Sequence, residues 1–288
     1  MKPFTLMSGV YIHHFIHLLR SAMDFCHQFN MIKRSFSCFL FRFLRLYFLL
    51  ITLYACGSKQ EEEPKVDHAF RSNLAEILLE AKAFEDAAPL VQRLVNESPE
   101  QPSSHYLLGF LLREKGSYQE AHKAFLKAIE LAPKYADPYA GLGILYALQK
   151  ENTKAISMFL KAIELNDKNP KYHNNLGFIY YLSKQYQKAD ESYRRSVSLA
   201  PTETKVYVNM AFNLAQMDRF DEANELFQKS LTQAEAINNI GLVLESKGKW
   251  KEAKERYLKS LELNPRLSSA KKNLQDLEEK IRKTPNHP

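Results

Sequence analysis

Residues 136–169 read ADPYAGLGILYALQKENTKAISMFLKAIELNDKN, and this stretch decides the fold. Its first half places Leu142 and Tyr146 four residues apart, and its second half does the same with Ala155 and Phe159. Residues at this spacing share one face of an α-helix. The stretch therefore predicts two amphipathic helices joined by a short polar turn.

The same pattern recurs along the chain with a nearly constant period. Alanines equivalent to Ala155 are Ala87, Ala121, Ala189, Ala223 and Ala253, and the intervals are 34 residues except for a last one of 30. Four residues after each alanine stands a larger apolar residue: Val91, Phe125, Phe159, Tyr193, Phe227 or Tyr257. A fixed period of this length indicates stacked helical hairpins, each of which buries its apolar face against its neighbours.

The period and its large and small positions resemble those of the tetratricopeptide repeat. The resemblance implies an all-α fold, an α-solenoid in which about six helical hairpins form a right-handed superhelix. The six predicted units are 68–101, 102–135, 136–169, 170–203, 204–233 and 234–267. Residues 268–282 keep apolar residues on one face, which predicts a helix that caps the last unit, and residues 283–288 are a tail.

The fifth unit is four residues shorter than the others. Its second helix should therefore lose about one turn, and the proline-containing linker that ends most other units is absent from it. We expect the superhelix to change its crossing geometry between the fifth and sixth units.

The residues before the repeats predict an export signal. Residues 31–56 combine four Lys and Arg with an apolar run at 46–55, which is too short to span a bilayer but suits a signal peptide. The run ends in Leu53-Tyr54-Ala55-Cys56, which resembles the lipobox of bacterial lipoproteins and implies a lipid on Cys56. Tyr54 is bulkier than the residue usual there, and an uncleaved N-terminal anchor is the alternative.

Two further segments flank this signal. Residues 1–30 precede a complete leader that starts at Met31, so we interpret them as an unused upstream start or a disordered segment. Residues 57–66 carry three consecutive Glu and one Pro, which is the composition of an acidic linker. All three cysteines lie before residue 57, so the repeats cannot contain a disulfide.

The net charge of +7 does not indicate nucleic-acid binding. Six of the 40 Lys and Arg, and only one of the 33 Asp and Glu, lie within residues 1–56, which leaves a net charge of +2 for the rest. The sequence also contains no phosphate-binding loop, no His-Glu-x-x-His and no Gly-x-Ser-x-Gly. We therefore expect no enzymatic activity, cofactor, metal, nucleic acid or small-molecule substrate, and we interpret His105 and His173 as packing groups.

The family resemblance implies where a ligand would bind, because helix A of each tetratricopeptide unit lines a concave groove. The predicted peptide-binding residues are Tyr106, Phe110, Arg113, Lys171, Asn174, Asn175, Phe178, Tyr181, Lys205, Asn209, Phe212, Asn238, Asn239 and Leu242. They are richest in units 4 to 6. Aromatic rings beside amides suit an extended peptide or a partner helix.

Asn175, Asn209 and Asn239 share the sixth position of three successive units. They look like the asparagine ladder in the repeats of O-linked N-acetylglucosamine transferases, which holds a peptide backbone, although Asn is common at this position in the family. Lys171 and Lys205 share the second position but do not complete the carboxylate clamp of chaperone-binding members.

These observations favour a membrane-tethered lipoprotein of the bacterial cell envelope, anchored in the inner or outer membrane with its body in the periplasm or at the surface. Its repeats would act as a non-enzymatic scaffold that binds a protein partner in the groove, for assembly of an envelope complex. The alternative is a cytoplasmic adaptor or targeting subunit that presents substrates to an enzyme.

Overall fold

The computed structural model describes residues 68–284. They belong to one compact unit, Val66–Pro288. The predicted leader, Cys56 and the acidic linker lie outside the described residues, and so does most of the predicted tail.

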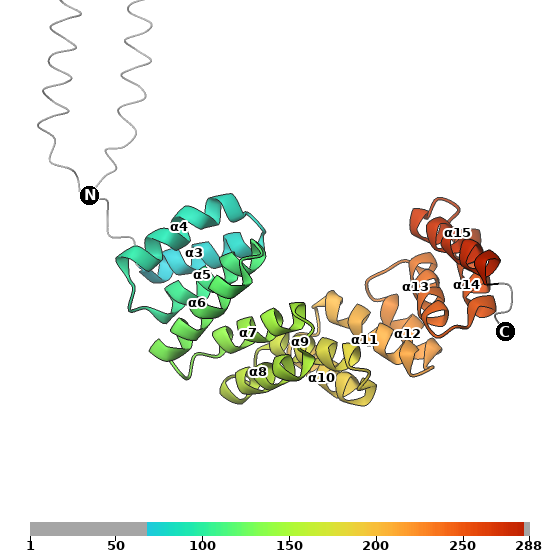
Figure 1. The fold of residues 1–288 in the computed structure, drawn as a ribbon. Helices are drawn as coiled ribbons and strands as arrows, with labels where there is room; N and C mark the ends of the chain where they lie inside the picture. Colours follow the sequence, from blue (N-terminus) through green and yellow to red (C-terminus); the bar gives the residue numbers. More distant parts are fainter. Residues whose placement is uncertain (1–67, 285–288) are drawn as a thin grey trace, which may run out of the picture. The chain divides into compact units, whose positions relative to one another are not determined.

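The described residues form thirteen α-helices and no strand (Figure 1). In chain order the helices are α3 (His68–Glu80), α4 (Phe84–Glu97), α5 (Pro102–Glu114), α6 (Tyr118–Leu131), α7 (Ala136–Leu148), α8 (Asn152–Leu165), α9 (Pro170–Leu182), α10 (Tyr186–Leu199), α11 (Thr204–Gln216), α12 (Phe220–Phe227), α13 (Gln233–Ser246), α14 (Trp250–Leu263) and α15 (Ser268–Lys283). Two helices fall within each predicted unit, and each helix packs against the next along the chain. The predicted all-α solenoid of helical hairpins is confirmed.

In five of the six hairpins, the core contains an aromatic ring of helix B packed on a small residue of helix A, and the first hairpin has Val91 in place of the ring. Phe125 of α6 and Phe159 of α8 are buried, and the alanines four residues before them are fully buried. A Cβ built on Gly143 would lie 2.9 Å from the Phe159 ring, which is closer than packed carbon atoms approach. The small residues therefore make room for the aromatic rings, as the sequence pattern indicated.

A second repeated contact is a hydrogen bond that joins a unit to the linker before it. In four units the fourth residue donates a hydrogen bond to the carbonyl oxygen six residues earlier. The pairs are His105–Pro99 (2.7 Å), Tyr139–Pro133 (3.1 Å), His173–Asp167 (2.9 Å) and Tyr207–Pro201 (2.9 Å). The two histidines thus hold the start of helix A against the preceding linker, which is a packing role.

The short fifth unit departs further from the repeat than the sequence predicted. Helix α12 has 8 residues where the helix B of every other unit has 14, so it loses six residues rather than about one turn. Unit 6 has Ile237 at its fourth position, which cannot donate the linker hydrogen bond. Instead Thr232 caps α13, accepting from the Glu235 amide while the Glu235 carboxylate accepts from the Thr232 amide. The change of crossing geometry stays a prediction.

Helix α15 covers the end of the stack. It packs against α14 and α13 and buries Ala270 and Leu277, while Leu274 and Ile281 are partly buried against the same core. Its other face carries charged side chains. A solenoid needs such a helix because its last hairpin would otherwise expose an apolar face.

Candidate functional site

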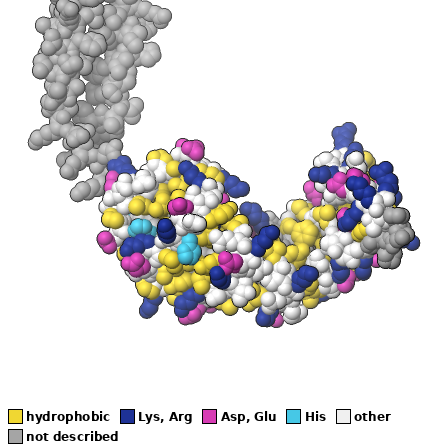
Figure 2. Space-filling view, in the orientation of Figure 1, with side chains coloured by type: hydrophobic (Ala, Val, Ile, Leu, Met, Phe, Trp, Pro, Cys, Tyr) yellow, Lys and Arg dark blue, Asp and Glu magenta, His cyan; other side chains and the backbone are white. Residues whose placement is uncertain are grey.

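The predicted site residues lie on helices α5, α9, α11 and α13, and the structure gives them very different exposure. Lys171, Lys205, Phe178 and Leu242 are exposed, the two apolar ones by 42% and 37%. Arg113 and Asn238 are buried. The half-buried ones are Tyr106, Phe110, Asn174, Asn175, Tyr181, Asn209, Phe212 and Asn239. In the space-filling view (Figure 2), the concave side of the described residues shows hydrophobic side chains at the surface, with Lys and Arg side chains beside them.

The amides of units 4 and 5 are joined by hydrogen bonds between neighbouring helices. Asn209 of α11 donates through Nδ2 to Oδ1 of Asn174 on α9, at 3.0 Å. Asn174 in turn donates to Oδ1 of Asn175, at 3.4 Å. The ladder residues Asn175 and Asn209 are therefore connected through Asn174, which orients all three side chains along the groove.

The same three-amide arrangement occurs at the C-terminal end of the stack. Asn273 of α15 donates to Oδ1 of Asn238 on α13, at 3.0 Å, and Asn238 donates to Oδ1 of Asn239, at 3.5 Å. Asn273 was missed in the sequence because the cap was treated as separate from the repeats. The signal was present, since Asn273 follows Asn239 by the full 34-residue period.

Asn238 does not face the open groove as predicted. Only 3% of it is exposed, because α15 packs over this position and supplies Asn273 as its partner. Asn238 therefore fixes its neighbours in place, while Asn239 and Asn273 remain at the surface of this end.

The amide chain is interrupted between units 5 and 6. The residue before Asn209 is Val208, whereas the residues before Asn175 and Asn239 are asparagines. Asn239 consequently finds no amide on α11 to bond, because valine offers neither donor nor acceptor. The ladder predicted over three successive units is thus two separate networks.

A pocket of about 170 Å³ lies at the other end of the groove, where α3, α5, α7 and α9 meet. Tyr106, Phe110 and Ile144 contribute apolar walls, and Lys171 and Asn175 lie at its α9 side. The structure thus brings predicted residues of units 2 and 4 together with carboxylates that the sequence did not single out. The carboxylates are Glu76, Glu80 and Asp137.

The polar groups of this pocket are partly paired. The Glu80 carboxylate forms an ion pair with Lys171, which lies 91 residues away along the chain. Asp137 accepts a hydrogen bond from the Tyr172 phenol. Glu76 forms no hydrogen bond or ion pair with another described residue. Burial, with the charges of Asp137 and Glu80, raises its pKa above the ordinary value of a glutamate.

Aromatic rings and one buried arginine complete the pocket. Tyr106 packs edge-on against Tyr135, with ring centroids 5.6 Å apart. Burial and the nearby Asp137 carboxylate raise the pKa of both phenols, so each stays protonated and neutral. Arg113 lies over the Phe110 ring at 4.5 Å and pairs with Glu114 at 2.7 Å, so its charge is already balanced.

The predicted aromatic residues Phe178 and Phe212 differ in how they pack. Phe178 stacks on Tyr181 with ring centroids 6.5 Å apart and remains exposed. Phe212 instead packs edge-on against Phe227, at 4.9 Å, and contacts the core of α11 to α15. Phe212 therefore contributes mainly to the hairpin, whereas Phe178 offers a surface to a ligand.

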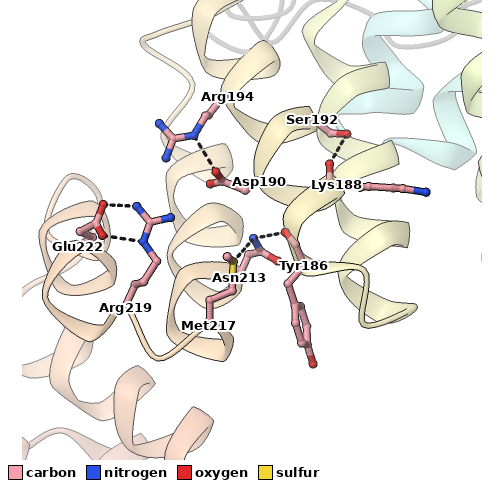
Figure 3. Close-up of polar contacts among 9 residues, drawn as sticks. All are labelled: Tyr186, Lys188, Asp190, Ser192, Arg194, Asn213, Met217, Arg219 and Glu222. Atoms are coloured by element: carbon pink, nitrogen blue, oxygen red, sulfur yellow. Dashed lines mark hydrogen bonds and ion pairs between the residues drawn. The ribbon is translucent and has the colours of Figure 1, made fainter.

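Polar contacts also surround the junction of units 4 and 5 (Figure 3). The fully buried Asn213 of α11 donates to the carbonyl oxygen of Tyr186, at 2.9 Å. Arg194 pairs with the buried Asp190 of α10, at 2.8 Å. The Asn213 hydrogen bond joins α11 to α10 and so serves the packing of adjacent units, whereas the Arg194–Asp190 pair lies within α10.

Within residues 68–284, no helix is both long and apolar enough to cross a bilayer. No group of three or more His, Cys, Asp or Glu side chains in this part of the chain is arranged to hold a metal ion.

Comparisons with known proteins agree with this geometry. A family model described as TPR repeat matches residues 111–150 and 145–183, and one described as Tetratricopeptide repeat matches residues 170–203 and 234–267. A search of the curated proteins finds no significant match.

Solved structures share the fold. YrrB, described as a TPR protein with an unusual peptide-binding site, is 23% identical with a TM-score of 0.50 and covers 62% of this chain and 95% of its own. The pilF protein of Pseudomonas aeruginosa is 18% identical with a TM-score of 0.57 and covers 74% and 97%.

The helical hairpins, their period and their grooved inner face define an α-solenoid repeat protein. The chain is a tetratricopeptide-repeat protein. This fold is that of a scaffold for protein–protein interaction.

Proposed function

We propose that the groove of this protein binds an extended peptide segment of a protein partner, without catalysing a reaction. The observation that carries the proposal is the pair of amide networks on successive helices. In the first, Asn175 keeps its Nδ2 donor and Asn209 its Oδ1 acceptor unused by the other described residues. An extended backbone presents one acceptor and one donor per residue, so these two groups match it.

Apolar side chains beside the networks would supply burial for the partner. Phe178 and Leu242 are exposed within the groove, and such rings and branched chains contribute most of the binding energy at peptide interfaces. YrrB, which shares the fold, is described as having a peptide-binding site. The remaining proposed contacts are Tyr106, Phe110, Arg113, Asn174, Tyr181, Lys205 and Asn239. Asn238 and Phe212 are not among them, because Asn238 lies under α15 and Phe212 packs within its hairpin. Lys171 is paired with Glu80.

The test replaces both free amides. Asn175→Ala combined with Asn209→Ala should reduce retention of a degenerate twelve-residue peptide library by about tenfold, because two hydrogen bonds to the backbone are lost. The melting temperature should not fall. Asn96→Ala, on the outer helix α4, is the matched control. Unchanged retention in the double variant would refute binding through these amides.

We propose further that the protein is tethered to a bacterial envelope membrane by a lipid on Cys56. The Leu53-Tyr54-Ala55-Cys56 motif after an apolar run supports this, and two or three acyl chains provide stable anchoring. Cells given radioactive palmitate should label the protein, and Cys56→Ala should abolish the label. Absence of label in the unaltered protein would favour the cytoplasmic adaptor instead.

A further inference from the structure

The N-terminal pocket of the groove carries more negative charge than its own residues neutralise. Three carboxylates line it, from Glu76, Glu80 and Asp137, and each acts on its neighbours. Of the two cationic side chains in the lining, Arg113 is paired with Glu114 on its own helix. Lys171 alone is left to balance the three acids, so the pocket favours a second positive charge.

Glu76 is the group that lacks a partner. Helix α3 places Glu76 and Glu80 four residues apart, so their side chains share the face that lines the pocket. The half-buried Glu76 carboxylate has no hydrogen bond or ion pair among the described residues, although it feels the negative charges of Asp137 and Glu80 and, more weakly, the positive charge of Lys171. A carboxylate in this position is stabilised by a cation that enters the pocket.

The chain itself shows how an ammonium group is held here. Lys171 reaches from α9 to the Glu80 carboxylate on α3, three units away. Both side chains are largely exposed, at 68% and 48%, and exposed pairs of this kind contribute little to stability. A competing cation can therefore displace Lys171 from Glu80 at small cost.

The walls and the size of the pocket limit what can enter. The Tyr106 and Phe110 rings and the Ile144 side chain would pack against an alkyl stem, and the face of an aromatic ring attracts a cation. The volume of about 170 Å³ is below the range of roughly 300–1,000 Å³ that is typical of small-molecule sites. The space suits one side chain.

We infer that this pocket receives a Lys or Arg side chain of the peptide bound in the groove. The inference rests on the proposed peptide binding and adds a charge requirement to it. The cationic head lies among the carboxylates of Glu76, Glu80 and Asp137, and its stem lies against Tyr106 and Phe110. A basic segment is thereby distinguished from a neutral or acidic one.

The experiment uses the full chain, immobilised in detergent, and four degenerate twelve-residue peptide libraries that differ only at a central position. That position is Lys, Arg, Glu or norleucine, which has an alkyl stem of the same kind as Lys without its charge. We expect the Lys and Arg libraries to be retained about tenfold better than the norleucine library. Glu76→Gln should reduce this ratio severalfold. The control Glu262→Gln, which alters an exposed carboxylate on α14, should not.

Removing a positive charge from the pocket should have the opposite effect on retention of the Lys library. Lys171→Ala frees Glu80, so it should raise retention of the Lys library about two- to threefold over the unaltered protein. Weaker retention would show that Lys171 assists rather than competes, and would overturn the inference.

The remaining outcomes separate the two proposals. Equal retention of all four libraries, or preference for the Glu library, would overturn the basic pocket while leaving peptide binding in place. Retention of none of them would overturn peptide binding itself. A ratio unchanged by Glu76→Gln would place the basic preference elsewhere in the groove and would also overturn this assignment.

Discussion

Phe125 lies between two glycines, Gly109 of its own unit and Gly141 of the next. A Cβ on either glycine would come within 2.6 Å of the Phe125 ring. The ring is fully buried and cannot swing away. At this point the repeat thus requires glycine for space rather than for backbone conformation, because neither residue has a positive φ.

The first prediction follows from that contact. Gly109→Ala should destabilise the protein by about 1–2 kcal/mol, since overpacking outweighs the gain in helix propensity. Chemical denaturation monitored by circular dichroism measures the loss. Adding Phe125→Leu should cost less than the sum of the two single changes, because the smaller side chain relieves the clash. Strictly additive costs would contradict the steric account.

Glu76 provides a prediction about pH. Its pKa is raised in the folded protein, so its contribution to stability is full below the unfolded value near 4.5 and is lost as the pH rises through the folded value. Glu76→Gln should therefore stabilise the protein at pH 7 by about 0.5 kcal/mol or less, since the group is half exposed. At pH 3 this gain should vanish. Urea midpoints at both pH values test it, and an equal gain at pH 3 would exclude the charge explanation.

At the level of elements, the turn inside each hairpin needs one residue with a left-handed backbone. Gly116 and Gly248 occupy it in units 2 and 6, with φ of 80° and 77°. In the other units a residue with a side chain takes the same φ, between 59° and 63°. These residues are Lys82, Lys150, Lys184 and Asp218. Non-glycine residues are strained in this region.

Glycine at such a turn should relieve the strain. We expect Lys150→Gly to raise the free energy of unfolding by about 0.5–1 kcal/mol, after allowing for the flexibility of glycine in the unfolded chain. Gly116→Lys should change stability by a similar amount in the opposite direction. Thermal melts of the two variants provide the measurement, and a loss of stability in Lys150→Gly would contradict the prediction.

The junction after α12 depends on a helix cap in place of the linker bond used elsewhere. Thr232→Ala should cost about 1 kcal/mol, because the first turn of α13 loses its side-chain acceptor. Thr202→Ala, in the preceding inter-unit turn, is the control, since its side chain bonds no other described residue. Denaturant midpoints compare the two, and equal effects would argue against the capping role.

On the scale of the described unit, the helices share cores with their neighbours only, so different parts can open separately. One core joins α11 to α15, and a separate cluster of four buried residues around Tyr193 links α10 to α11. The same region holds buried oxygen atoms without a partner among the described residues, on Asp190, Tyr193, Asn213 and Asn224. Each such atom costs about 1–3 kcal/mol.

The α10–α11 junction should therefore be the first to separate. Hydrogen exchange in low denaturant should show α13 and α14 opening together with α11 and α12, and independently of α5 to α8. Mass spectrometry of peptic fragments resolves these segments. A single opening free energy for all helices would contradict this order.

Much of the fold could be predicted from single residues. The alanine period located both helices of each unit, and the proline-containing linkers marked where most units end. The shortening of α12 was underestimated, because a four-residue deletion was assumed to come out of the helix alone. In the structure the residues after Phe227 leave the helix to rebuild the turn before Thr232.

The site was predicted less completely. The asparagines at the sixth position of the units predicted a ligand site in the groove. The structure shows that their hydrogen bonds run through Asn174 and Asn238, and that the last network includes Asn273. No local pattern marked Glu76, Glu80 and Asp137, which read as ordinary surface acids of two helices.

The sequence by itself determined the hairpins, their number and their register, because each helix buries its apolar face against helices close to it in the chain. Such contacts produce a regular spacing of apolar residues in the sequence, from which the helices can be located. Only the tertiary structure decided which charges meet across the groove, as Lys171 and Glu80 do over 91 residues. That meeting depends on the small rotation between successive units, which is set by the packing of every hairpin in between and adds up over three of them.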